Sequence, residues 1–466
     1  MVDVARYKRI VQLFWDPEPT NDRLQDAPIW CLGCSYDLSS PTKQTAAAAK
    51  PSTASESTTT LQLSSSTDSK PDATSSNNPE HANTVDEQKA STIDDAPYDF
   101  VASNVSPPPA HTGHNPDGGW PAPFLDDFQS RLWMTYRSNF DIIPKSTDPQ
   151  ATQSLSLSMR IKSQLTDQNG FTSDAGWGCM IRTGQSLLAN TMAIQTLGRD
   201  WRLGDYGQAE RHIISKFADH PDAPYSIHNF VKHGAEACGK YPGEWFGPSA
   251  TARCIQSLVN STEAAFRVYS TGDSADVYED CFMEVAKPDG TNFVPTLVLV
   301  TTRLGIDKIT PVYWEALVAA LQMPQSVGIA GGRPSSSHYF VGVQGMFFYY
   351  LDPHISQPAL PFHQDVSKYT HEELSTFHTR RLRRLHIKEM DPSMLIGFLI
   401  RSEDEWWEWR AGVKHVQGRP VISVFDRNPM RGMDERAEAI DEVESLSEAD
   451  GLEEGEEEEE EADQRL

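Results

Sequence analysis

The chain has 466 residues and a formal net charge of −26, which is enough for one large domain or two ordinary ones. More than half of that charge lies after residue 433, where 17 Asp and Glu accompany two Arg, so the preceding 433 residues carry only −11. No basic stripe is present to neutralise phosphates, which excludes nucleic acid as the expected partner. The one basic cluster, Arg380–Arg384, is interpreted as a solvated helix face or a patch for an acidic protein.

Six cysteines in a chain of this length do not form a disulfide framework. The first residues contain Arg6, Lys8 and Arg9 and no long apolar run, so we expect no signal peptide. No stretch approaches the roughly 18 apolar residues of a membrane-spanning helix. The composition therefore predicts a cytoplasmic protein without a membrane span.

Composition divides the chain into four segments. Residues 1–37 begin with the apolar and basic stretch Val4–Trp15, which is compatible with a short helix. Residues 38–117 are rich in Ser, Thr, Ala and Pro and bury too little apolar area to offset chain ordering, so we predict a disordered insertion. Residues 118–426 hold the folded domain, and the acidic residues 427–466 are predicted to be a disordered tail.

Within the folded domain, a helical pattern precedes a series of strands. After Cys179, apolar residues recur at Met180, Leu187 and Ile194, which predicts a helix. Four strands are then expected, the first apolar enough to be covered on both faces: Thr296–Thr302, Ser326–Ala330, His338–Val343 and Met346–Leu351, with Gly345 turning the last two into a hairpin. One helix is expected at Val312–Leu321, because Thr310 and Pro311 before it are typical of a helix start. Another is expected to begin at a capping box of Ser402 and Glu405. Its three tryptophans are interpreted as packing residues: Trp406, Trp407 and Trp409.

Cys179 lies in the segment Asp174–Ser186, which reads DAGWGCMIRTGQS. A thiol at a helix N-terminus is stabilised as the thiolate by the helix dipole and the free amides. Gly176 and Gly178 would let a substrate backbone come close. A buried cysteine that opens a core helix fits the same pattern. A thiol hydrolase also needs an imidazole base and a carboxylate that orients it.

Two histidines are candidates for the base. His338 begins one predicted strand and Asp352 follows the next, which would give the order Cys, His, Asp. Alternatively, Asp352 and His354 flank Pro353, which fixes its own φ and holds the preceding residue extended. The residues alone leave both possibilities open.

Together these segments resemble the autophagins, the cysteine proteases that process the ubiquitin-like modifier of autophagy. The resemblance covers residues 118–418 and a short piece at 27–33, and it implies a papain-like α+β fold in which the nucleophile's helix packs on a mostly antiparallel sheet. Further matching blocks occur in family order: Ser130–Arg137, Leu197–Trp201, Tyr225–His228, Trp245–Ser249, Met323–Ser326, Gly331–Pro334, Ser337–Phe340 and Met390–Ser393.

The resemblance implies a role for each candidate residue. Cys179 would be the nucleophile, His354 the general base and then acid, and Asp352 the group that orients the imidazole. His338 is left as a satisfied histidine near the site. Tyr136 matches the tyrosine whose hydroxyl helps to stabilise the oxyanion, alongside the backbone amide of Cys179.

Trp245 and Pro334 match the residues that cover the catalytic groove in this family. Gly331 and Gly332 are interpreted as a hinge for that lid. A narrow groove suits a scissile bond that follows glycine, because only a backbone without a side chain can thread it.

The implied function is a cysteine endopeptidase that cleaves after the C-terminal glycine of the autophagy modifier. It would mature the precursor and release the modifier from phosphatidylethanolamine. The expected partners are therefore the free and the lipid-conjugated modifier. We expect a monomer without a cofactor, cytoplasmic and recruited to the phagophore assembly site, with the nucleus as a second location. Two alternatives are a protease for another ubiquitin-like protein, since the deufmylating proteases share the Asp-Pro-His arrangement, and a catalytically silent scaffold that binds the modifier.

Two features remain outside the catalytic pattern. Cys31 and Cys34 have the spacing of a redox or zinc motif but no second ligand pair nearby, so they are interpreted as structural. Cys238, Cys254 and Cys281 have no chemical context.

Within the insertion, Tyr98–Val101 fits the aromatic-x-x-aliphatic pattern of peptides that add a strand to the modifier's sheet. Tyr98 and Val101 would enter apolar pockets, and Asp94 and Asp95 lie just upstream. Tyr7–Ile10 also fits this pattern, but its neighbours are basic.

Overall fold

The structure is a computed structural model of the whole chain, and it describes residues 18–21, 27–38, 117–156, 159–160, 169–204, 206–333 and 336–430. Several predictions lie outside these residues: the N-terminal helix, the insertion with Tyr98 and Val101, Pro334, and most of the acidic tail.

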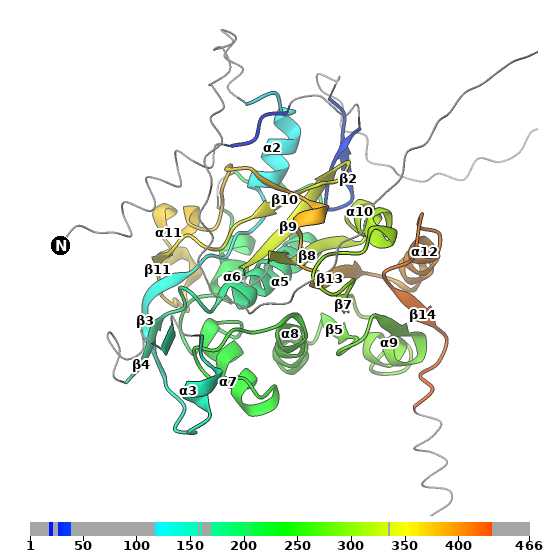
Figure 1. Cartoon of the computed structure of the whole chain (residues 1–466). Helices are drawn as coiled ribbons and strands as arrows, with labels where there is room; N and C mark the ends of the chain where they lie inside the picture. The colour runs from blue at the N-terminus through cyan, green and yellow to red at the C-terminus, as the bar shows by residue number, and fades with distance from the viewer. Residues whose placement is uncertain are drawn as a thin grey trace, which may run out of the picture. The chain divides into compact units, whose positions relative to one another are not determined.

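A nine-stranded sheet organises the described part of the chain (Figure 1). Its main path runs β12 (Arg383–His386), β10 (Phe347–Leu351), β9 (Ser336–Gln344), β8 (Ser326–Arg333), β13 (Ser393–Ile400), β7 (Thr296–Arg303) and β5 (Arg267–Ser270). Neighbouring strands on this path are antiparallel, except that β5 is parallel to β7. The hairpin of β1 (Ile29–Cys31) and β2 (Cys34–Tyr36) pairs with β9. The predicted mostly antiparallel sheet is confirmed.

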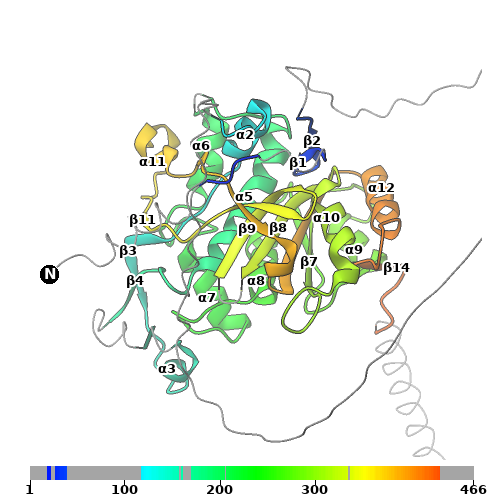
Figure 2. The same ribbon diagram turned by 45° about the horizontal axis from the view of Figure 1, so that its top comes forward.

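Helices cover both faces of this sheet (Figures 1 and 2). On one face, α5 (Cys179–Leu197) contacts β8 and β9, and α8 (Pro248–Thr262) contacts β5, β7 and β13. On the other, α10 (Trp314–Gln322) contacts β8 and β9, and α12 (Glu403–Lys414) contacts β13. The fold is therefore α+β, with a separate apolar core on each side of the sheet.

The strand β7 shows why this sheet needs two cores. Leu297 and Leu299 belong to the core shared with α5 and α8, whereas Val298 and Val300 belong to the core shared with α10 and α12. Successive side chains of a strand point to opposite faces, so an unbroken apolar run is stable only between two covering layers. The predicted doubly covered strand is confirmed.

The remaining elements surround this frame. The helices are α2 (Ala122–Gln129), α3 (Ala151–Ser154), α6 (Gln208–Ser215), α7 (Ile227–Ala237), α9 (Glu279–Ala286) and α11 (His371–Ser375), with short 3₁₀ turns at Pro311–Tyr313, Val366–Lys368 and Ile387–Glu389. A second sheet joins β11 (Gln357–Pro358), β3 (Arg137–Pro144) and β4 (Gly170–Ser173), and a third joins β14 (Ser423–Phe425) and β6 (Asp276–Tyr278).

Local signals at helix ends were only partly predictive. Pro311 begins a 3₁₀ turn that leads into α10, but the side chain of Thr310 makes no capping bond. Ser402 accepts a hydrogen bond from the amide of Glu405 at 3.2 Å, as predicted. The Glu405 carboxylate accepts from the amide of Arg401 rather than from Ser402, so the predicted reciprocal capping box is wrong in its second half.

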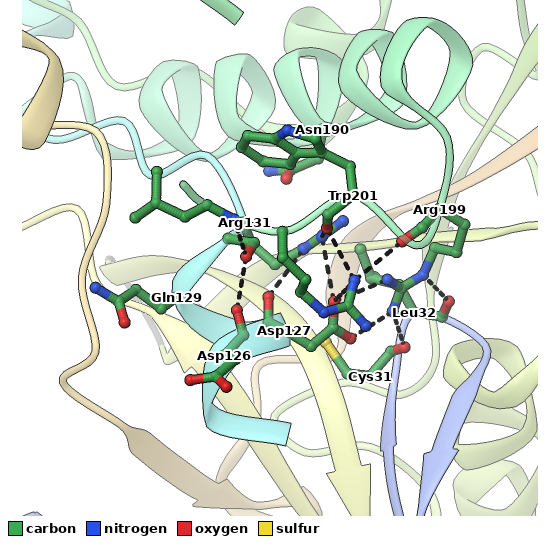
Figure 3. A network of polar contacts seen from close by, with 12 residues as sticks. Cys31, Leu32, Asp126, Asp127, Gln129, Arg131, Asn190, Arg199 and Trp201 are labelled. Carbon is green, nitrogen blue, oxygen red and sulfur yellow. Dashed lines mark hydrogen bonds and ion pairs between the residues drawn. The ribbon is translucent and has the colours of Figure 1, made fainter. Parts of the chain in front are cut away.

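A buried ion cluster fixes the β1–β2 hairpin to the rest of the domain (Figure 3). Asp127 of α2 is fully buried and pairs with Arg199 at 2.7 Å, Arg202 at 3.1 Å and Arg131 at 3.2 Å. Arg199 also donates to the carbonyl oxygen of Leu32 at 2.9 Å. Burial alone would raise the pKa of Asp127, but the three guanidinium groups hold that pKa below its usual range.

The guanidinium groups of this cluster outnumber its carboxylate, and their remaining N–H groups donate to backbone carbonyl oxygens. Arg199 donates to Cys31 as well as to Leu32, and Arg131 donates to Trp201 at 3.2 Å (Figure 3). Cys31 is fully buried beside Asp127, and burial raises the pKa of its thiol. The turn between Cys31 and Cys34 is thus part of a structural clamp.

Candidate active site

The loop before α5 places Cys179 as the first residue of that helix. The amides of Trp177 and Gly178 both donate to the carbonyl oxygen of Asp174, at 3.1 and 2.9 Å. Gly176 has a φ of +98°, and a Cβ on Gly178 would lie 2.5 Å from the Asp174 carboxylate. Both glycines are therefore required by the loop itself. This packing reason is additional to the expected access for a substrate backbone.

Asp174 anchors this loop through buried hydrogen bonds of its carboxylate, a role that the sequence did not reveal. Its carboxylate accepts from the amide of Arg137 at 2.6 Å and from the guanidinium of Arg182 at 2.7 Å. Arg182 also pairs with the buried Asp219 at 2.8 Å. Burial raises the pKa of Asp174, and Arg182 opposes that shift. The network thus links β3 to α5, the helix that begins with Cys179.

The Asp352–His354 turn follows β10 and is tightly held. Nδ1 of His354 lies 2.6 Å from Oδ1 of Asp352, and the amide of His354 donates to the same oxygen at 3.1 Å. The indole of Trp133 donates to the carbonyl oxygen of Asp352 at 2.8 Å, and the amide of Tyr136 donates to that of Pro353 at 2.9 Å. The segment before β3 therefore holds the backbone of the turn that carries Asp352 and His354.

Cys179 and His354 shift each other's pKa in opposite directions. Cys179 is only 2% exposed, and burial alone would raise its pKa, but hydrogen bonds with His354 and with the backbone of Ser337 lower that pKa below its usual value. Burial would lower the pKa of His354, but its bonds to Asp352 and Cys179 raise that pKa to about 9. Both shifts favour the thiolate–imidazolium form of the pair over the neutral form.

His338 lies close to this pair without joining it. Its Nε2 is 3.9 Å from Oδ1 of Asp352, beyond hydrogen-bond range, and its ring packs edge-on against Tyr350 at 4.4 Å. Burial lowers the pKa of His338 to about 4, so the ring is neutral at physiological pH. Of the two histidines left open by the sequence, only His354 is hydrogen-bonded to Asp352.

Tyr136 borders the thiol on one side. It is 6% exposed, and its ring stands edge-on to that of His354 at 5.3 Å. Burial, the neighbouring charge of Cys179 and a hydrogen bond to its sulfur raise the pKa of Tyr136. The hydroxyl is therefore protonated and points at the reacting atom.

Trp245 borders the thiol on the solvent side. Its indole N–H donates to Sγ of Cys179 at 3.4 Å, while 41% of the residue stays exposed. It lies in the segment 238–247 between α7 and α8. An indole at this distance narrows the approach to the sulfur.

Gly331 and Gly332 lie inside the paired part of β8, opposite His338 and Ser337. A Cβ on Gly331 would lie 2.9 Å from that of Met394, and one on Gly332 would lie 2.0 Å from the carbonyl oxygen of Ser336. Close packing thus accounts for both glycines, and their predicted hinge function stays a prediction.

The strand β9 adds two serines that the sequence reasoning missed. The hydroxyl of Ser336 lies 3.2 Å from Nε2 of His354, and Ser337 contributes the backbone hydrogen bond to Cys179. The predicted strand His338–Val343 and the family block Ser337–Phe340 both fall in β9, but neither indicated that Ser336 and Ser337 contact the catalytic pair.

One group at the site could also ligate a metal. Ligand atoms of His338, Asp352 and His354 lie within 4.8 Å of one another. A metal ion there would replace the Asp352–His354 hydrogen bond, so the arrangement suits acid–base chemistry better than ligation.

Comparison with known proteins agrees with this geometry. The peptidase C54 catalytic domain matches residues 121–412. "Probable cysteine protease ATG4" of Cryphonectria parasitica is 56% identical over 454 residues, covering 95% of each chain. "Cysteine protease ATG4" of Pyricularia oryzae is 55% identical over 478 residues, covering 96% of this chain and 97% of that protein.

The fold, the thiol–imidazole pair and these matches define a cysteine-type peptidase. The chain belongs to the peptidase C54 family, the autophagins that its sequence motifs indicate. Among the described residues, no helix is both long and apolar enough to cross a membrane.

Proposed function

We propose that this protein cleaves the peptide bond after the C-terminal glycine of a ubiquitin-like autophagy modifier, both in the modifier's precursor and in its phosphatidylethanolamine conjugate. The observation that carries the proposal is the hydrogen bond between Cys179 and His354. Nδ1 of His354 is in turn held by Oδ1 of Asp352 at 2.6 Å, and the indole of Trp245 donates to the same thiol. Family membership supports the substrate class.

Acylation begins with attack of the Cys179 thiolate on the glycine carbonyl carbon. A carbon–sulfur bond forms, and the carbonyl oxygen takes the negative charge. The Cys179 amide at the start of α5 and the Tyr136 hydroxyl are the donors next to that oxygen. One such donor contributes about 10²–10³ in rate. His354 then protonates the leaving amine as the carbon–nitrogen bond breaks.

Deacylation uses the same groups in reverse. Neutral His354 takes a proton from water, which attacks the thioester and restores the Cys179 thiolate. Asp352 keeps the imidazole oriented through both steps, since it binds Nδ1 and leaves Nε2 facing the thiol and Ser336. The leaving amine differs between precursor and lipid conjugate, but each bond is the amide of a glycine carbonyl. One mechanism therefore serves both substrates.

The preference for glycine follows from the crowding above the thiol. Trp245 lies 3.4 Å from Sγ of Cys179, and Tyr136 and His354 occupy the other side. A side chain on the residue that acylates the enzyme would meet the indole. We place Trp245 and Pro334 over the groove, with Gly331 and Gly332 in the strand that leads to Pro334.

The remaining assignments also belong to this proposal. The protein acts as a monomer in the cytoplasm and at the phagophore assembly site, with the nucleus as a second location. Tyr98 and Val101 provide a second contact with the modifier, tethered to the enzyme by the insertion, which raises the effective concentration of substrate without touching the chemistry.

Incubation with purified precursors tests the proposal and separates its rivals. The autophagy modifier precursor should be cleaved after glycine, and precursors of other ubiquitin-like proteins should stay intact. Preferential cleavage of another precursor would favour the alternative protease. Tight binding of the autophagy modifier without cleavage of any precursor would favour the scaffold.

A further inference from the structure

Three metal-binding side chains that the catalytic proposal does not use converge between α7 and α8. They are His233 in α7, Cys238 at its C-terminal cap, and Cys254 in the second turn of α8. One ligand atom from each lies within 4.8 Å of the other two. The sequence alone showed no context for these cysteines, because the packing of two helices brings them together.

The surroundings combine a buried sulfur with a route to solvent. Cys254 is fully buried, and its thiol contacts the carbonyl oxygen of Phe230 at 3.6 Å. Cys238 and His233 are partly exposed. Within the described part of the chain, the imidazole of His233 makes no hydrogen bond or ion pair. Its ring nitrogens are therefore free for a ligand that enters from outside.

We propose that His233, Cys238 and Cys254 form a binding site for a zinc ion. Thiolate and imidazole are the ligands that zinc prefers, at about 2.3 and 2.0 Å from the metal in a tetrahedral arrangement. Three ligand atoms already within 4.8 Å of one another reach that geometry through small side-chain movements. Water or an external ligand completes the fourth position. Each thiol loses one proton when it binds, and no electron is transferred.

A disulfide between Cys238 and Cys254 is the competing use of the same sulfurs. It would require an oxidant to accept two electrons, and it would leave His233 without a function. Zinc binding uses all three groups and releases only protons. The convergence of an imidazole on the two thiols therefore favours the metal.

The position of the site connects it to the catalytic groove. Cys238 and Cys254 flank the segment that carries Trp245, the residue that donates to the Cys179 thiol. The same segment is already packed at Phe246, whose ring lies 2.3 Å from where a Cβ on Gly234 would be. A metal ion bound to both cysteines would tie the start of this segment, at Cys238, to α8, the helix that follows the segment. Zinc is thus expected to restrict the movement of Trp245.

Cobalt titration of the full-length, reduced protein tests this proposal directly. The Cys179→Ser background removes the thiol beside the His338–Asp352–His354 group, which could otherwise bind the probe. Co²⁺ should produce the near-ultraviolet band of sulfur-to-cobalt charge transfer and the visible bands of a tetrahedral ion, at about one equivalent per chain, and Zn²⁺ should displace it.

Because Cys254 is fully buried, Cys238→Ser and His233→Gln are the informative variants. Cys238→Ser should remove about half or more of the charge-transfer band, and His233→Gln should weaken binding about tenfold or more. Cys281→Ser, at another partly buried cysteine, is the matched control and should behave like its parent.

Two results would overturn the assignment. One is an absent charge-transfer band, or a band of unchanged strength in Cys238→Ser. The other is peptide mapping that finds Cys238 and Cys254 joined in a disulfide, together with a reduced protein that takes up no metal.

Discussion

Oδ1 of Asp352 accepts two hydrogen bonds from His354, one from the ring Nδ1 at 2.6 Å and one from the backbone amide at 3.1 Å. One oxygen atom, two residues away in sequence, thus fixes the position of the imidazole and holds the proton on Nδ1. Pro353 between them holds the turn in place through its fixed φ. His338 approaches the same oxygen only to 3.9 Å.

His354→Ala should cost far more activity than His338→Ala, because only His354 contacts both Asp352 and the thiol. We expect at least about 10²-fold loss for the first, which is typical of a removed general base. Turnover of a purified modifier precursor measures both variants, with thermal unfolding as a check on folding. A larger loss in His338→Ala, for variants that melt like the parent, would transfer the role of base to His338.

The pH profile of kcat/KM should be broad on its basic side. The active pair is thiolate and imidazolium, and His354 keeps its proton until pH approaches its pKa of about 9. Activity should therefore fall as pH rises through about 9. Asp352→Asn removes the negative charge that helps to raise this pKa and weakens the hydrogen bond to Nδ1, so the basic limb should move to lower pH. A basic limb at the same pH in Asp352→Asn would show that another group controls it.

Asp127→Asn should strongly destabilise the domain. Three guanidinium groups would lose their one buried carboxylate, and breaking a buried pair in this way costs about 3–5 kcal/mol. The neighbouring Asp126→Asn is the matched control. The Asp126 side chain is 58% exposed, and its one ion pair among the described residues is with Arg380 on the surface, worth about 0–1 kcal/mol. Urea unfolding of both variants measures the difference. Equal unfolding free energies would mean that the cluster in Figure 3 is not a clamp.

Tyr98→Ala with Val101→Ala should raise KM and leave kcat unchanged, chiefly on the lipid-conjugated modifier. The proposed contact acts through effective concentration and not through the chemistry. KM and kcat are measured on vesicles that carry the conjugate, for the double variant and its parent, with Tyr7→Ala as the control. If titration with the free modifier gives the double variant the parent's affinity, the motif is not a docking site.

Short patterns of residues along the chain were enough to predict several helices and strands of the fold. The spacing of Met180, Leu187 and Ile194 predicted α5, and the apolar run at 296–302 predicted β7, because each pattern depends only on how one element is covered by its neighbours. The Asp-Pro-His turn was likewise visible, since proline restricts its own neighbours.

Contacts between distant segments were not visible. Asp174 binds the backbone of β3 and a guanidinium of α5, and His233 meets Cys254 only after two helices pack. Nothing in the spacing of these residues along the chain marks such pairs. For the same reason, the choice between His338 and His354 needed either the family resemblance or the measured distances to Asp352.

Covalent trapping shows which cysteine is the nucleophile. The autophagy modifier is prepared with its C-terminal glycine replaced by an electrophilic glycine analogue and incubated with the full-length protein at neutral pH. Peptide mapping should place the adduct on Cys179, and Cys179→Ala should form none. An adduct on any of the other five cysteines, or an undiminished adduct in Cys179→Ala, would contradict the account.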